Sequence, residues 1–375
     1  MSQEEKAKQE TSFRKLHHLE ICLKEKVQSH ETTKIEDFHL VHRAICDLDF
    51  DEIDTSLVLW GKKLQLPLVA AAMTGGHPDV RKINENVAIA AQKYGFAMGV
   101  GSQRAALEKN MPYITESFEV VRQLAPDVLL IANLGAAQFG KKWNYREEQI
   151  EKAINLIKAQ AIAIHVNPGQ EVIQIEGDTY FQGFWQRLNG IAEKIKVPII
   201  LKEVGSGFSR EDAQKVENSP LSGIDIGGLG GTSWIGVETL RLEKETSSLN
   251  YEMGNLFWDW GIPTAISLVE TRSVTNKTLI ATGGIRNGMQ AAKMIALGAD
   301  IAGMALPFLE AAAQGLEELD ILVKKFQKEL KITMFLTGCK NLEELRSIPV
   351  VVSGYSKDWM EQRGIDLSMP WRKKI

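Results

Sequence analysis

Short apolar runs recur along the chain from about residue 66, and each is followed by small or polar residues and then by a stretch with helical spacing. The runs occupy residues 67–73, 95–100, 128–132, 161–166, 197–201, 223–226, 279–281 and 300–304. Continuous apolar runs without alternation are typical of parallel strands that are buried on both faces. The pattern therefore predicts eight strands that alternate with helices.

The stretches between the runs place apolar residues on one helical face. Ile83, Val87 and Ala90 share such a face, and Gly95 follows where this helix should end. Strand–helix units at roughly 30-residue spacing predict an α/β fold of the TIM (β/α)8 barrel type. A doubly wound sheet is the alternative, and it is disfavoured because MTGG at residues 73–76, and not GxGxxG, follows the first run.

Two segments interrupt this rhythm. Residues 1–65 predict an N-terminal extension with a flexible tail, a basic segment and a strand pair around residues 57–64 that plugs the barrel. Residues 232–261, after the sixth run, form a Trp-rich insertion, and long loops of this kind are usually active-site lids. We expect the barrel over residues 66–350 and a C-terminal tail over 351–375, with basic residues 372–374 exposed to solvent.

Composition narrows the class of partner. A net charge of −4 predicts neither nucleic acid nor a membrane surface, so an anionic ligand would need local donors. Three widely spaced cysteines, Cys22, Cys46 and Cys339, argue against a disulfide framework. The charged N-terminus does not resemble a signal peptide, and no apolar tract suits a membrane span. We therefore expect a cytoplasmic protein.

Polar side chains stand where most of the predicted strands end, which is the catalytic face of a TIM barrel. They are Thr74, Ser102 with Gln103 and Arg104, Asn133, His165 with Asn167, Lys202 with Glu203, and Thr232 with Ser233. One such residue would suit a turn or a helix cap. Six strand ends that converge on one face indicate a functional site.

Glycines follow the seventh predicted strand, in the segment TGGIRNG at residues 282–288. Gly283 and Gly284 allow a close approach of backbone to ligand, and the helix that follows presents free N–H groups. The eighth strand also ends in small residues, at 303–305. Loops after strands seven and eight form the usual phosphate site of TIM barrels, so we predict one here, with a tight turn as the alternative.

Two residues and one basic cluster have more than one open interpretation. A buried Lys202 needs a partner, which is Glu203, another carboxylate, or an anionic cofactor such as the N1–C2 edge of a reduced flavin. Glu171, in the segment HVNPGQE at 165–171, either caps locally or binds Mg²⁺, which often takes one carboxylate plus phosphate and water. The basic cluster at residues 14–18 is either solvated surface or part of the site.

The motifs, taken in order, resemble those of the FMN-dependent type 2 isopentenyl-diphosphate isomerases over nearly the whole chain. They are RK-x-x-H (14–18), MTGG (73–76), GVGSQR (99–104), ANLG (132–135), H-x-NP-x-QE (165–171), GGTSW (230–234), GGIR (283–286) and ADIAGMALP (299–307). GVGSQR and H-x-NP-x-QE together are the most specific. The resemblance implies interconversion of isopentenyl and dimethylallyl diphosphate with reduced FMN as an acid–base and electrostatic cofactor, with Mg²⁺, and with NADPH as the reductant.

The resemblance also assigns roles to residues. FMN would be bound by Met73, Thr74, Gly75, Ser102, Asn133, Lys202, Thr232, Gly283, Gly284, Arg286, Ala305 and Leu306. The substrate would be bound by Arg14, Lys15, His18, Arg104, His165, Asn167 and Gln170, with Gln170 and His165 catalytic and Glu171 the metal ligand. Family members form homotetramers or homo-octamers, so Arg14 and Lys15 serve either their own subunit or a neighbour. Gly227 departs from the Ser of some relatives, which puts one hydrogen bond to the flavin edge in doubt.

Other enzymatic functions of this barrel class need residues that this sequence does not have at the expected positions. An FMN-dependent 2-hydroxyacid oxidase needs a His base near strand six, where this chain has GLGGTSW, and a nucleotide dehydrogenase of the same barrel class needs a Cys there. A non-enzymatic flavin or phosphate carrier would need neither the 165–171 cluster nor Arg104. The isomerase is therefore the favoured hypothesis.

Overall fold

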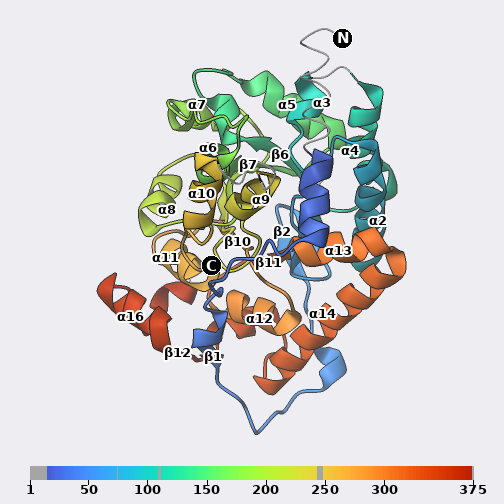
Figure 1. Ribbon diagram of the computed structural model, residues 1–375. Helices are drawn as coiled ribbons and strands as arrows, with labels where there is room; N and C mark the ends of the chain where they lie inside the picture. Colours follow the sequence, from blue (N-terminus) through green and yellow to red (C-terminus); the bar gives the residue numbers. More distant parts are fainter. Residues whose placement is uncertain (1–14, 74, 109–110, 243–247, 374–375) are drawn as a thin grey trace.

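The computed structural model describes residues 15–73, 75–108, 111–242 and 248–373, and its centre is a closed barrel of eight parallel strands (Figure 1). Around the barrel these are β4 (Leu68–Ala70), β5 (Ala97–Gly99), β6 (Leu130–Gly135), β7 (Ala161–Val166), β8 (Ile199–Glu203), β9 (Gly223–Asp225), β10 (Thr278–Ala281) and β11 (Ile301–Met304). Each predicted run overlaps one of these strands, and β11 pairs with β4 to close the barrel. The predicted TIM barrel is confirmed.

Two strands extend past their apolar runs into polar sequence. The strand β6 continues through Asn133 to Gly135, and β8 continues through Lys202. The register then aligns Gly135, His165, Lys202 and Asp225 in one row across β6, β7, β8 and β9. Backbone groups make the ladder, so polar side chains can occupy strand ends without interrupting it. The register thus gathers polar side chains at one end of the barrel.

Helices form the outer layer of the barrel and its extensions (Figure 1). They are α2 (Pro78–Tyr94), α3 (Arg104–Glu108), α4 (Pro112–Leu124), α5 (Glu147–Ile157), α6 (Pro168–Ile173), α7 (Phe184–Ala192), α8 (Arg210–Glu217), α9 (Trp234–Arg241), α10 (Leu249–Leu256), α11 (Thr264–Arg272), α12 (Gly288–Ala296), α13 (Leu306–Gln314), α14 (Leu316–Leu336), α15 (Leu342–Ser347) and α16 (Gly354–Gln362), with 3-10 turns at Ile35–Asp37, Phe50–Glu52, Ala136–Phe139 and Pro370–Lys373. The predicted face of α2 is buried, at Ile83, Val87 and Ala90. None of the helices described has the length and apolar character to cross a membrane.

The predicted strand pair before the barrel is present as the antiparallel hairpin β2 (Leu57–Leu59) and β3 (Lys62–Leu64). Leu59 and Leu64 are buried in one apolar cluster with barrel residues that include Ile200. Because the hairpin leads into the start of β4, it covers the N-terminal end of the barrel and leaves the opposite end open for a site.

The insertion after β9 folds as α9 and α10, and the N-terminal segment is attached to its base. Gln28 pairs with Thr232, and the Ser29 N–H donates to the Gly231 carbonyl at 2.8 Å. This pairing brings the helical residues 15–24 to the open end of the barrel, where they line the cavity described below.

The C-terminal segment packs on the rest of the chain, so the expected exposure of Arg372 is wrong, and Lys374 lies outside the described residues. The strand β12 (Val350–Val352) pairs antiparallel with β1 (Phe38–Leu40). After α16, Arg363 forms an ion pair with the buried Glu270 at 2.6 Å. Arg372 is buried and donates to two main-chain carbonyls at 3.0 and 3.1 Å. Carbonyl acceptors satisfy this guanidinium, which is why a basic residue can lie inside.

Candidate active site

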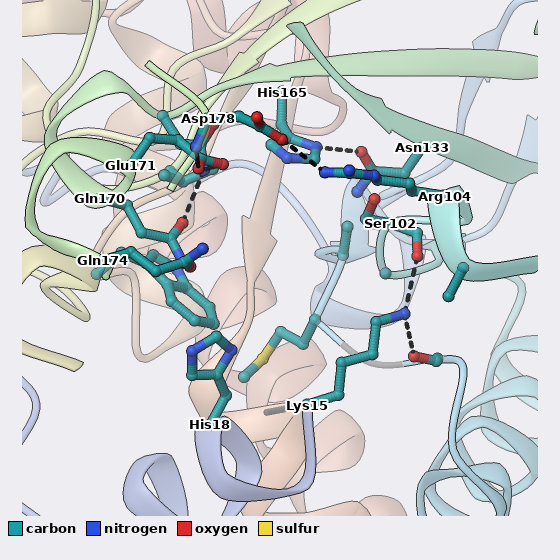
Figure 2. Close-up of a pocket in the computed structure, with 18 of the residues that line it drawn as sticks. Lys15, His18, Ser102, Arg104, Asn133, His165, Gln170, Glu171, Gln174 and Asp178 are labelled. Carbon is teal, nitrogen blue, oxygen red and sulfur yellow. Dashed lines mark hydrogen bonds and ion pairs between the residues drawn. The ribbon is translucent and has the colours of Figure 1, made fainter. Parts of the chain in front are cut away.

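A cavity of about 400 Å³ lies at the C-terminal ends of the barrel strands (Figure 2). The predicted site residues that line it are Lys15, His18, Met73, Gly75, Ser102, Arg104, Asn133, His165, Asn167, Gln170, Glu171 and Lys202. Figure 2 shows Lys15 and His18 facing His165 and Asn133 from across the cavity. The predicted residues Arg14 and Thr74 lie outside the described residues.

The remaining predicted residues lie in the neighbouring loops, where two glycine-rich segments pack against each other. Gly283 and Gly284 have φ of 101° and 74°, in the left-handed region. A β-carbon on Gly284 would lie 2.3 Å from the Gly230 carbonyl oxygen, so only glycine fits this contact. Beside them, Arg286 holds a buried guanidinium nitrogen, Nη2, that has no hydrogen-bond partner in the described part of the chain. A buried donor without an acceptor fits an anionic ligand.

A helix N-terminus follows the eighth barrel strand, β11. Leu306 opens α13, and Ala305 before it provides no side-chain cap. The first N–H groups of α13 therefore receive no cap from residue 305, and they lie where TIM barrels bind phosphate. Thr232 stands at the base of the insertion, paired with Gln28. This chemistry fits the phosphate of FMN.

Lys202 lines the cavity at the end of β8, and its ammonium pairs with Asp225 Oδ2 at 2.8 Å. The neighbouring Glu203 carboxylate instead accepts from the N–H groups of Val204 and Gly205, at 2.7 and 2.6 Å. Burial raises the pKa of Glu203 to about 7, although these hydrogen bonds act to lower it. Of the open interpretations of Lys202, a partner carboxylate other than Glu203 is confirmed and pairing with the Glu203 carboxylate is wrong.

His165 and Asn133 are joined by a hydrogen bond of 2.8 Å between Nδ1 and Oδ1. The Asn133 amide nitrogen donates to the Val100 carbonyl at 3.1 Å, which directs the amide oxygen toward His165. Nδ1 of the imidazole therefore donates. Burial, with the positive charges of Lys202 and Lys15, lowers the pKa of His165 to about 4, so this ring is neutral near pH 7.

An amide and carboxylate network occupies the side of the cavity formed by α6 and α9. Asn167 Nδ2 donates to Gln170 Oε1 at 2.9 Å and to Glu171 Oε1 at 3.0 Å. Gln170 Nε2 donates in turn to Glu238 Oε1 at 2.9 Å. His18 Nε2 lies 2.9 Å from the same carboxylate oxygen. The network connects the N-terminal helix to the β7 loop through Glu238.

Glu238 was missed by the sequence reasoning. It is 1% exposed on α9 and also pairs with Arg241. Burial acts to raise the pKa of Glu238, but His18, Arg241 and Gln170 outweigh it and lower the pKa to about 2. A lone acid in a helix has no motif, and its position inside the predicted lid is the one signal that the sequence offered.

The Arg104 guanidinium is held in place by acids and an aromatic ring. It donates to Asp178 Oδ2 at 2.9 Å and to Glu108 at 3.0 Å, and it stacks over Trp143 at 4.0 Å from the ring centroid. Lys142 reaches the other Asp178 oxygen at 2.7 Å. Asp178 and Trp143 were not predicted. They gather cationic groups at one end of the cavity, which suits a diphosphate.

Known proteins similar to this chain agree with this chemistry. The family model described as FMN-dependent dehydrogenase matches residues 146–351. The chain is 45% identical over 364 residues to the isopentenyl-diphosphate delta-isomerase of Methanosarcina mazei, covering 96% of this chain and 98% of that protein. It is 47% identical over 363 residues to the isomerase of Pyrococcus furiosus, covering 95% and 90%. A mandelate oxidase structure aligns with a TM-score of 0.63 at 15% identity, covering 90% and 95%, which shows the fold alone.

The barrel, the glycine loops and the buried Arg286 thus place the chain among the FMN-dependent dehydrogenase class of TIM barrels. Within that class, the chain belongs to the isopentenyl-diphosphate delta-isomerase family. The resemblance inferred from the motifs is confirmed.

Proposed function

We propose that this protein interconverts isopentenyl diphosphate and dimethylallyl diphosphate with the help of reduced FMN. The observation that carries the proposal is the make-up of the cavity. Cationic Lys15 and Arg104 line it together with apolar side chains, and the amide of Gln170 is held at its wall by the buried carboxylate of Glu238.

The cationic side chains suit a diphosphate. Lys15 donates to the carbonyls of Gly75 and Ser102, at 2.7 and 3.1 Å, and these contacts hold its ammonium at the cavity wall. Arg104 is oriented by Asp178, and its planar fork can bind phosphate oxygens with two hydrogen bonds. Local cations of this kind offset the net negative charge of the chain.

The apolar wall suits a five-carbon isoprenoid chain. It includes Leu19, Met73, Trp234 and Leu309. The reaction adds a proton to the terminal carbon of the double bond and removes another from the neighbouring methylene, so no atom is oxidised. The cation-like centre that develops would react with water, and an apolar enclosure excludes it.

The residues that are expected to contact the cofactor suit FMN. Arg286 and Gly284 would hold its phosphate, and Lys202 would face its ring. When bound in its reduced form, FMN supplies an electron-rich ring and exchangeable protons. Gln170 is fixed by Asn167 and Glu238, so its amide keeps one orientation at the cavity wall.

An FMN-dependent oxidoreductase is the alternative, since mandelate oxidase shares the fold. Oxidation of a 2-hydroxy acid needs a base near the end of the sixth barrel strand, and the loop after β9 begins GGLGG at residues 227–231. His165 is on β7 and hydrogen-bonded to Asn133. These residues favour the isomerase.

Mg²⁺ would be bound through Glu171. Among the described residues, no three His, Cys, Asp or Glu side chains are grouped as a metal site, so the metal would need substrate phosphate oxygens and water as its other ligands. Glu171 Oε2 accepts from the Asp178 N–H at 2.6 Å and Oε1 accepts from Asn167 Nδ2 at 3.0 Å, and each oxygen keeps a second lone pair that a metal could use. The local cap and the metal ligand are thus compatible.

The proposal extends to the reductant, the assembly and the location. NADPH would reduce the bound flavin before turnover begins. The family resemblance supports a homotetramer or homo-octamer. The free thiols of Cys22, Cys46 and Cys339 are consistent with the cytoplasm, where thiols stay reduced.

An anaerobic assay tests the proposal. Purified protein with FMN, Mg²⁺ and isopentenyl diphosphate is photoreduced and then followed in D₂O. We expect many turnovers of deuterium-labelled dimethylallyl diphosphate while the flavin stays reduced. Gln170→Ala should slow turnover and leave FMN bound, because Gln170 lines the cavity and the phosphate loop at residues 283–286 does not. Reoxidation of one flavin per substrate molecule would overturn the proposal and favour hydride transfer.

A further inference from the structure

Asp225 occupies an unusual position for a charged residue. It ends β9 inside the barrel wall, directly beside Lys202 in the register of β8 and β9, and it is 5% exposed. Lys202 lines the cavity, and Asp225 stands behind it, outside the set of residues that line the cavity. A TIM barrel interior is normally filled by branched apolar side chains.

Both carboxylate oxygens of Asp225 are used. Oδ2 pairs with the Lys202 ammonium at 2.8 Å, and Oδ1 accepts from the hydroxyl of Thr282, at the end of β10. Thr282 Oγ1 itself accepts from the Gly227 N–H at 3.0 Å. The carboxylate is therefore fixed by three neighbouring strands and their loops.

This pair is a poor choice for stability alone. Desolvating two charges often costs as much as their attraction returns, and apolar residues of the same size would serve the barrel as well. The pair instead controls the charge that faces the cavity. Lys202 alone would present a full positive charge to the cofactor ring, whereas the Lys202–Asp225 pair presents an oriented N–H donor with little net charge.

We propose that Asp225 is a positioning residue that sets the reduction potential of bound FMN through Lys202. This inference rests on the proposed function, because it requires FMN with its ring against Lys202. A cation next to the ring favours the reduced, more negative flavin, and the carboxylate behind it opposes that effect. Asp225 thereby keeps the reduced cofactor from being held as a strongly stabilised anion.

The test is the midpoint potential of FMN in the holoenzyme. Asp225→Asn keeps the shape and removes the negative charge, so the potential should rise by about 30 mV, a tenfold shift of the two-electron equilibrium. The double variant Asp225→Asn with Lys202→Met removes both charges and should reverse most of that rise. Asp300→Asn is the matched control, since Asp300 pairs with Arg272 at 2.9 Å just before β11, at the other end of the barrel. It should leave the potential unchanged.

A second pair of variants guards against failure of Asp225→Asn to fold. Thr282→Val removes the hydroxyl that partly neutralises the carboxylate, so the potential should fall, and Thr282→Ser should restore it. An unchanged or lower potential in FMN-loaded Asp225→Asn, or no change in Thr282→Val, would overturn the inference. Failure of the proposed function would look different, because the wild-type protein would then not bind FMN or not isomerise the substrate.

Discussion

Replacing Glu238 with glutamine should destabilise the protein far more than an ordinary surface charge substitution. Glu238 is 1% exposed and contacts His18, Gln170 and Arg241. Its pKa falls from 4.5 to about 2, because these partners outweigh the effect of burial. At about 1.4 kcal/mol per pKa unit, the ionised form is stabilised over the neutral form by about 3 kcal/mol. Glutamine imitates the neutral form, so the free energy of unfolding at pH 7 should fall by about 3 kcal/mol.

The lowered pKa of Glu238 also predicts how the stability difference between the two proteins changes with pH. The pKa of Glu238 is lower in the folded protein, so its contribution is complete above about pH 4.5 and is lost as the pH falls toward about 2. Wild type and Glu238→Gln should therefore differ most at pH 7, and by roughly half as much near pH 3.

Urea denaturation of the holoenzyme, followed by circular dichroism, measures both quantities. The control is Glu176→Gln, because Glu176 contacts the same Arg241 at 3.2 Å from a position that is 47% exposed. That variant should lose less than about 1 kcal/mol. Equal losses in the two variants, or a Glu238→Gln difference that does not narrow at low pH, would refute the reasoning.

Three other outcomes are expected. Glu171→Gln should raise the Mg²⁺ concentration needed for half-maximal activity at least about tenfold and leave the flavin spectrum intact, and a wild-type metal requirement would show that Glu171 only caps the loop. His165, with a pKa of about 4, should stay neutral near pH 7. The free energy of unfolding should fall as the pH drops from about 6.5 to about 4, because the unfolded chain binds a proton that the folded chain does not. An NMR titration midpoint near 6.5 for His165 would contradict this. Arg286→Gln should weaken FMN binding by about tenfold or more in a fluorescence titration without lowering stability, and unchanged affinity would place the phosphate elsewhere.

The barrel could be predicted from the sequence because its signal is local. The eight strands are largely buried on both faces, so most of each one appears as a continuous apolar run. The same holds for much of the site. His165, Asn167, Gln170 and Glu171 lie within one short segment after such a run, and a TIM barrel brings every strand end to the same face. The positions of these residues along the chain were enough to place them together.

Only the tertiary structure decided which charged side chains form ion pairs. Lys202 pairs with Asp225 on the next strand and not with the carboxylate of its neighbour Glu203. The register of β8 and β9 places Lys202 opposite Asp225, and the Glu203 carboxylate accepts from N–H groups of the loop that follows it. Glu238 reaches Gln170 only because α9 packs on α6. The sequence around a carboxylate does not show which distant side chain it will pair with. Its partner is set by strand order and helix packing, which depend on the whole fold.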